Sequence, residues 1–182
     1  MRFQDWSAVV FDLDGTVVEL PIDWETLWVN LAEELSQEGI STSDLLSWEL
    51  LESATKADKR STAESMISPV EVKGAHKSIR LPLADAVESV SGPVAICSLN
   101  CEDACRVALQ RHGLLKHVDV IIGRDTLNVW KPNPKPLEYA IEQLGISRGG
   151  ALFVGDSQRD AITARRANVE FIYVSDATSK SS

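Results

Sequence analysis

Five short apolar runs constrain the fold of this chain more than any other feature of its sequence. Each run has four or five residues, and most do not alternate with polar residues, as expected of strands buried on both faces of a parallel sheet. The runs lie at residues 8–11, 94–97, 118–122, 151–154 and 171–174. Helical patterns over 102–112, 136–144 and 160–167 separate the later runs. The alternation predicts an α/β fold with a doubly wound, Rossmann-like parallel sheet of about five strands.

The interval between the first two runs is far longer than a single crossover needs. Trp24, Leu27, Trp28, Leu31 and Leu35 follow helical spacing behind a capping Asp23. We expect further helices over 44–51 and over 82–90, and another that begins at a capping box formed by Ser68 and the residues after it. The stretch 52–65 is expected to be a loop or a weak helix. The sequence therefore predicts a small helical cap over 20–90, inserted after the first strand of an α/β core made of 1–19 and 91–182.

Three features of this insertion bear on its role. Its three tryptophans are interpreted as the packing core of the cap and not as a stacking platform. Lys56, Lys59 and Arg60 lie close together, and two interpretations stay open: a site for a second anionic group of a substrate, or a solvated basic surface. The linkers at 17–21 and 91–93 are the expected hinges, since Gly92 can absorb backbone rotation.

Charge and composition narrow the class of partner. The net charge is 18 − 27 = −9, which argues against nucleic-acid binding but still allows a small phosphorylated metabolite. No apolar run approaches the roughly 20 residues that span a bilayer, and the N-terminus does not resemble a signal peptide, so we expect a cytoplasmic protein with no membrane partner. The odd number of cysteines, at 97, 101 and 105, argues against disulfides and a thiolate metal site. The sequence does not predict the oligomeric state.

Polar residues follow every apolar run at its carboxyl end. Ligands of open α/β sheets bind outside the carboxyl ends of the strands. Asp12 and Asp14 follow the first run, and two carboxyl groups in different environments can serve as nucleophile and proton donor. Gly15 lets main-chain N–H groups approach an anion closely. The pattern indicates a site at this edge of the sheet with two carboxyl groups and room for an anion beside Gly15.

Four motifs, in order, resemble those of the haloacid dehalogenase superfamily. The first is Phe-Asp-Leu-Asp-Gly-Thr at residues 11–16, and the second is Ser98 at the end of the second run. The third is Lys131 in a Lys-Pro-x-Pro segment, and the fourth is Gly-Asp-Ser-Gln-Arg-Asp at 155–160. The resemblance covers the whole chain and is strongest toward phosphoglycolate phosphatases.

This resemblance implies a role for each matching residue. The implied catalytic residues are Asp12 as nucleophile, Asp14 as general acid and base, Ser98 on a phosphoryl oxygen, and Lys131 as a neutralising cation. The implied substrate-binding residues are Gly15, Thr16, Leu99 and Asn100. The implied ligands of a Mg²⁺ cofactor are the Asp12 carboxylate, the Asp14 main-chain carbonyl and Asp156, with Asp160 a further ligand or a support.

The function that the resemblance implies is a Mg²⁺-dependent phosphatase that hydrolyses a small phosphate monoester through an aspartyl phosphate. Two alternatives remain open: a sugar phosphomutase of the same family, and a non-catalytic regulatory or scaffold protein on the same fold. The presence of both Asp12 and Asp14 favours an enzyme, because a binding module has no need of two such carboxyl groups.

Overall fold

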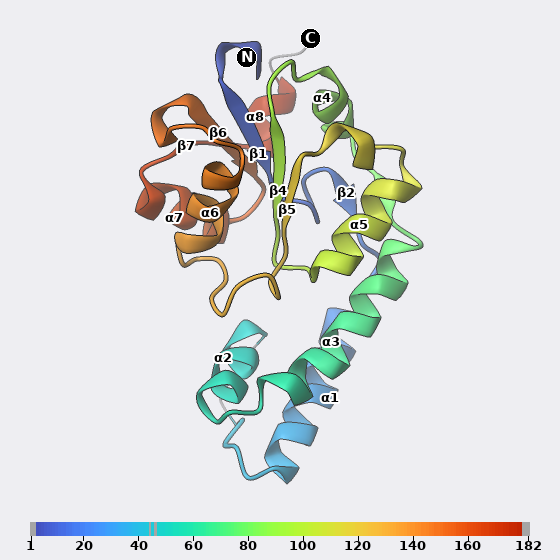
Figure 1. Cartoon of the computed structure of the whole chain (residues 1–182). Helices are drawn as coiled ribbons and strands as arrows, with labels where there is room; N and C mark the ends of the chain where they lie inside the picture. Colours follow the sequence, from blue (N-terminus) through green and yellow to red (C-terminus); the bar gives the residue numbers. More distant parts are fainter. Residues whose placement is uncertain (1–2, 44, 46, 180–182) are drawn as a thin grey trace.

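The computed structural model describes residues 3–43, 45 and 47–179. Five parallel strands form one sheet in the order β5-β4-β1-β6-β7 (Figure 1). The strands are β1 (Ala8–Phe11), β4 (Val94–Cys97), β5 (Val120–Ile122), β6 (Ala151–Gly155) and β7 (Glu170–Tyr173). The central strand β1 therefore has β4 on one side and β6 on the other, which makes its carboxyl end a topological switch point. The predicted α/β fold with about five parallel strands is confirmed.

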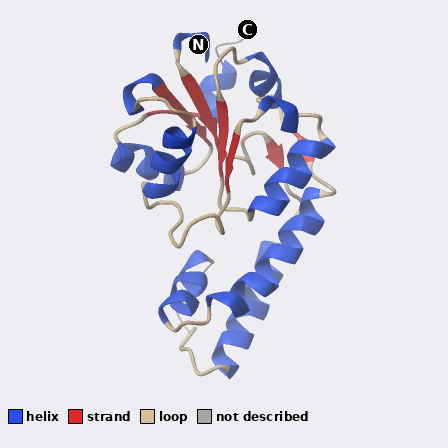
Figure 2. Cartoon of the chain, viewed as in Figure 1, coloured by secondary structure: helices blue, strands red, loops and turns tan. Residues whose placement is uncertain are grey.

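Helices cover both faces of this sheet (Figure 2). Side chains alternate along β1, so that Val9 and Phe11 join one hydrophobic cluster and Val10 joins the other. The first cluster includes side chains of α4 (Ala84–Ser89), α5 (Glu102–Arg111) and α8 (Val174–Ser179), and the second includes side chains of α6 (Lys135–Gln143) and α7 (Gln158–Ala167). Three 3₁₀ turns complete this unit at η1 (Phe3–Asp5), η2 (Leu115–His117) and η3 (Arg148–Gly150). No described helix has the length and apolar character needed to cross a bilayer.

The predicted cap consists of three helices beyond the carboxyl ends of the strands (Figure 1). They are α1 (Trp24–Gln37), α2 (Trp48–Lys56) and α3 (Arg60–Ala75). The Asp23 carboxylate caps α1 by accepting from the Thr26 main-chain N–H at 3.1 Å. The three helices enclose their own apolar cluster, in which Leu31, Leu35 and Leu51 are completely buried. α3 extends from this cluster to lie alongside α5 of the core.

Two short strands connect the cap to the core. β2 (Val18–Glu19) leads out of the core and pairs antiparallel with β3 (Ile79–Arg80), which returns to it. Beyond β3, the side chains of Leu83, Ala84 and Val87 are buried in the core cluster. We therefore propose that the cap ends near residue 78 rather than at residue 90.

The predicted hinge at 91–93 has the wrong location. Gly92 lies at the amino end of the sheet, whereas the cap lies at the carboxyl end. A Cβ atom added to Gly92 would lie 2.7 Å from the Ser7 main-chain oxygen, so this glycine permits close packing of two chain segments.

Helix boundaries in the cap also differ from the prediction, and the stretch 52–65, expected as a loop or a weak helix, is helical over 52–56 and 60–65. α2 begins at Trp48 instead of residue 44, although residues 44 and 46 themselves lie outside the described part. α3 continues through Pro69, where a new helix was expected to begin. The continuous helix places Glu64, Ser68 and Glu71 on one face, where all three contact Arg124 of the core. This tertiary contact outweighs the capping signal at Ser68.

The three cysteines are buried in the hydrophobic clusters of the core. Burial raises the pKa of the Cys97 and Cys101 thiols to about 12, so they stay protonated. Cys97, Cys101 and Cys105 belong to no candidate metal group among the described residues. These positions act as small apolar core residues.

Candidate active site

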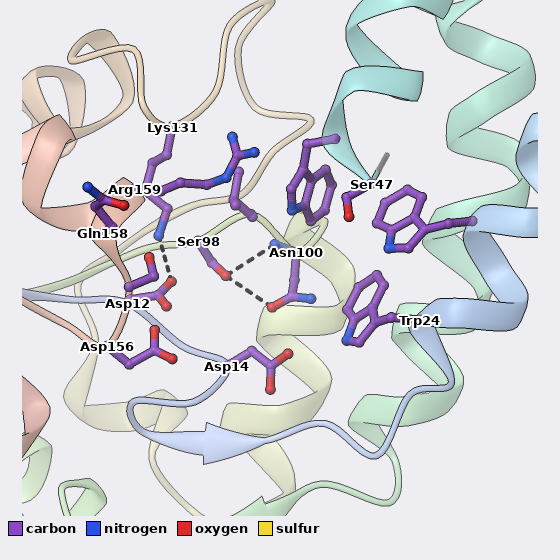
Figure 3. Close-up of a pocket in the computed structure, with 14 residues that line it drawn as sticks. Asp12, Asp14, Trp24, Ser47, Ser98, Asn100, Lys131, Asp156, Gln158 and Arg159 are labelled. Carbon is purple, nitrogen blue, oxygen red and sulfur yellow. Dashed lines mark hydrogen bonds and ion pairs between the residues drawn. The ribbon is translucent and has the colours of Figure 1, made fainter. Parts of the chain in front are cut away.

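The candidate site lies at the switch point, where β1 ends between β4 and β6. The Asp12 main-chain N–H donates to the Val154 carbonyl at 2.8 Å, which continues the sheet ladder up to the carboxyl group. A cavity of about 550 Å³ opens here between the core and the cap (Figure 3). Its walls are formed by Asp12, Asp14, Ser98, Leu99, Asn100, Lys131 and Asp156–Arg159 from the core and by Trp24, Trp28, Ser47 and Trp48 from the cap.

Lys131 joins two buried carboxylates at the base of this cavity. Its Nζ atom donates to Asp12 Oδ1 at 2.8 Å and to Asp160 Oδ1 at 2.5 Å. Burial lowers the pKa of a lysine, but these two carboxylates outweigh it, so the pKa of Lys131 is raised and its ammonium group stays charged. Asp160 is fixed in turn by Ser157, whose main-chain N–H donates to Asp160 Oδ2 at 3.1 Å in the capping box of α7.

The two carboxyl groups of the first motif occupy different environments. Burial raises the pKa of Asp12 to about 7, although the Lys131 ammonium lowers it. Burial also raises the pKa of Asp14 to about 6, and the Leu20 main-chain N–H, which donates to Asp14 Oδ1 at 2.7 Å, lowers it. The Asp12 carboxyl group is thus held by the Lys131 ammonium at the base of the cavity, and the Asp14 carboxyl group by the linker that leads into the cap.

Three carboxyl groups lie close enough together to share a metal ion, although both oxygens of Asp160 already accept hydrogen bonds, from Lys131 and Ser157. Asp12, Asp156 and Asp160 each offer an oxygen atom, and these atoms lie within 4.8 Å of one another. Such an all-oxygen set fits a hard divalent cation such as Mg²⁺. Gly15 allows this arrangement, because a Cβ atom on it would collide with the Asp156 carboxylate. The Asp14 side chain lies outside this group.

The loop with Ser98, Leu99 and Asn100 is held from both the core and the cap. Ser98 Oγ donates to Asn100 Oδ1 and accepts from the Asn100 main-chain N–H, both at 3.1 Å. The Leu99 carbonyl accepts from Arg124 Nη1 at 2.7 Å, and Asn100 Nδ2 donates to Glu71 Oε1 at 3.4 Å. Glu71 belongs to α3, so a cap helix directly positions a loop of the site.

Some predicted site residues lie elsewhere. Thr16 is completely buried and does not line the cavity, because its main-chain N–H closes a turn onto the Leu13 carbonyl at 3.2 Å. Its Oγ1 atom has no hydrogen-bond partner among the described residues. Gly15 lines a neighbouring hollow shared with Asp14 and Asp156.

The basic cluster of the cap does not face the cavity. Arg60 Nη2 donates to the carbonyls of Arg124 and Leu127 at 3.1 and 3.2 Å, so it bridges cap and core. Lys59 forms an ion pair with Glu38 at 3.5 Å. Arg60 is therefore neither available to bind a second anionic group of a substrate nor part of a solvated basic surface.

Sequence reasoning missed the cap wall of the cavity. Trp24, Trp28 and Trp48 pack against the cap cluster, but each is only partly buried and each lines the cavity. The prediction that they form the cap core was thus incomplete. Arg159 was also missed; it follows Asp156 within the fourth motif, and that proximity was the available signal.

Comparisons with known proteins agree with this geometry. A family model described as haloacid dehalogenase-like hydrolase matches residues 9–174. A phosphoglycolate phosphatase of Rhodospirillum rubrum is 30% identical over 191 residues, which cover 93% of this chain and 79% of the relative. A phosphoglycolate phosphatase of Neisseria gonorrhoeae is 28% identical, with 88% and 76% covered. The crystal structure of a phosphatase from Thermococcus onnurineus superposes with a TM-score of 0.62 at 25% identity, covering 92% and 85% of the two chains.

Proposed function

We propose that this chain, which belongs to the haloacid dehalogenase-like hydrolases, hydrolyses a small phosphate monoester with Mg²⁺ through an aspartyl-phosphate intermediate. Phosphatase activity as such follows from the family and from the relatives named phosphoglycolate phosphatase. The observation that carries the finer proposal is the Asp12 carboxylate, which faces the cavity and is held by Lys131 at 2.8 Å.

Asp12 is the nucleophile in this proposal. Its carboxylate attacks phosphorus while the bond to the leaving oxygen breaks, and Asp14 donates a proton to that oxygen. Asp14 then takes a proton from the water that attacks the aspartyl phosphate, which releases phosphate and restores Asp12. Asp14 suits both steps because it lines the same cavity as Asp12 and is oriented by the Leu20 N–H group.

Positive charge must surround the phosphoryl oxygens in this reaction. Asp12, the Asp14 main-chain carbonyl and Asp156 would hold Mg²⁺, which supplies the charge that lets a phosphate dianion lie beside carboxylates. Lys131 supplies a second, permanent positive charge, and Asp160 keeps it in place through the ion pair at 2.5 Å. Ser98 and Asn100 line the cavity, and in this proposal the Ser98 hydroxyl exchanges its hydrogen bond to Asn100 Oδ1 for one to a phosphoryl oxygen.

Replacement of the nucleophile tests this proposal. Asp12→Asn exchanges the carboxylate for a nearly isosteric amide of far lower nucleophilicity, so phosphate release should fall by several orders of magnitude while the circular dichroism spectrum stays unchanged. Asp85→Asn, at an exposed carboxyl group that pairs with Arg80, is the matched control and should retain activity. Wild-type activity should also vanish in excess chelator and return with Mg²⁺. Full activity of Asp12→Asn, or of the wild type in chelator, would contradict the proposal.

A further inference from the structure

The cap wall of the active-site cavity is made almost entirely of indole rings. Trp24 and Trp28, one turn apart on α1, are stacked with ring centroids 5.6 Å apart and an interplanar angle of 15°. Trp48 of α2 meets Trp28 edge-on at 5.0 Å and Trp24 at 6.0 Å. Figure 3 shows Trp24 and Ser47 across the cavity from Asp12, Asp14 and Asp156. The leaving group of a phosphate bound at Asp12 would therefore extend toward these rings.

This aromatic wall is preorganised by the core. The Arg124 guanidinium lies 5.6 Å from the centroid of the Trp48 ring and is itself completely buried. Trp48 in turn contacts the other two rings. A rigid wall loses little conformational entropy when a ligand stacks on it, and this favours affinity.

The described residues of the cap present no charged group to the cavity. Among the described residues, the contribution of the cap consists of the three tryptophans and Ser47. Lys59 and Arg60, the nearby candidates, are engaged with Glu38 and with the core carbonyls. A small anionic leaving group such as glycolate would thus find no cationic partner on the cap side among the described residues, and the Arg159 cation of this cavity belongs to the core. Such a leaving group would also fill little of a cavity of about 550 Å³.

Building on the proposed phosphatase function, we propose that the preferred substrate is a phosphate monoester whose leaving group carries a flat aromatic ring. The ring would stack on the indole groups of the cap while the phosphate lies at Asp12. Arg159, which lines the cavity from the start of α7, adds a planar cation that stacks on aromatic rings.

A quaternary ammonium group, the other ligand that aromatic walls bind, fits less well. Trp24 and Trp28 stack on each other instead of surrounding a common centre. The Arg159 guanidinium in the same cavity would also repel a cationic leaving group. These two observations favour an aromatic ring over a quaternary ammonium group.

A matched pair of substrates tests the inference without any mutation. Benzyl phosphate and cyclohexylmethyl phosphate both release a primary alcohol of similar shape, but only the first carries an aromatic ring. A merely apolar wall would favour the cyclohexyl compound, which has the larger apolar surface. Stacking on the tryptophans should instead favour benzyl phosphate by about tenfold in kcat/KM. A ratio at or below one in the wild type would overturn the inference.

Variants locate the preference on the cap. Trp24→Leu keeps an apolar side chain without a ring, so the ratio of the two kcat/KM values should fall toward one. Trp6→Leu is the matched control, because Trp6 packs against the core cluster and does not line the cavity; its ratio should equal that of the wild type. An unchanged ratio in Trp24→Leu and in Trp48→Leu would overturn the role of the tryptophans. Phosphate release with no aromatic preference would leave the proposed function standing, whereas no release from either compound or from p-nitrophenyl phosphate would refute both.

Discussion

Removal of the Arg124 guanidinium should strongly destabilise the junction of cap and core. Arg124 is completely buried and donates to Glu71 Oε1 at 2.5 Å, to Glu64 Oε2 at 2.6 Å, to the Leu99 carbonyl at 2.7 Å and to Ser68 Oγ at 3.2 Å. Three of these four partners belong to α3 of the cap, and the fourth to the loop that follows β4. Arg124 thus connects the cap helix α3 to the loop of the site in addition to the contacts made by Glu71 and Arg60.

The structure sets the size of the expected effect. Arg124→Met roughly preserves volume but leaves the Glu71 carboxylate, which is also completely buried, without its cation. Loss of one partner of a buried ion pair costs about 3–5 kcal/mol of the free energy of unfolding. Glu71→Gln should cost less, about 1–2 kcal/mol, because Arg124 retains Glu64 and the Leu99 carbonyl.

Urea unfolding followed by circular dichroism measures these costs. In the double variant the neutral amide at position 71 removes the unpaired charge, so its destabilisation should be clearly smaller than the sum of the two single effects. Arg106→Met is the matched control, since Arg106 forms a half-exposed pair with Glu102 and should change the free energy of unfolding by less than about 1 kcal/mol. A loss below about 1 kcal/mol in Arg124→Met, or strict additivity in the cycle, would refute the reasoning.

Two further predictions concern the turn after Asp12 and the pH dependence of stability. Gly15→Ala should lower kcat/KM at least about tenfold by displacing the Asp156 carboxylate, whereas Gly39→Ala, at a similar positive φ with open space around it, should cost only about 1 kcal/mol of backbone strain and leave activity unchanged. Burial raises the pKa of Glu64, but hydrogen bonds from Arg124 and Ser68 outweigh this, so the pKa lies below its ordinary value of 4.5. Because a depressed carboxyl pKa stabilises the folded state above the unfolded-state value, Glu64→Gln should be less stable than the wild type at pH 7. This deficit should shrink in urea unfolding experiments as the pH falls through and below 4.5; a deficit independent of pH would contradict the assignment.

The core of this protein is predictable from its sequence because each buried strand is a short apolar run that can be recognised without its partners. β1 is apolar at every position since both of its faces are covered, with Val9 in one cluster and Val10 in the other. Asp12 and Lys131 are 119 residues apart in the sequence yet form a hydrogen bond. The resemblance of four motifs predicted that both residues belong to one site, and the parallel topology brings the segments that carry them to one edge.

The ends of the cap helices were harder to predict because distant partners decide them. Ser68 and Glu71 have the spacing of a capping box, but in the folded protein both side chains bond to Arg124. Pro69 removes one main-chain donor from α3, and this usually costs about 3 kcal/mol. The contacts that one continuous helix makes with Arg124 offset that cost, and no local pattern contains this information.

The role of the tryptophans is the clearest limit of local patterns. The spacing of Trp24, Leu27, Trp28 and Leu31 predicts one apolar face of α1, and the structure has it: both leucines are buried in the cap cluster. The spacing does not show whether a residue at the edge of that face packs against other cap helices or faces a cavity. Leu31 is completely buried in the cap cluster, whereas Trp24 and Trp28 are only partly buried and line the cavity that Asp12 also lines. An apolar stripe and an aromatic ligand wall have the same helical period, so only the placement of the cap over the carboxyl ends of the strands distinguishes them.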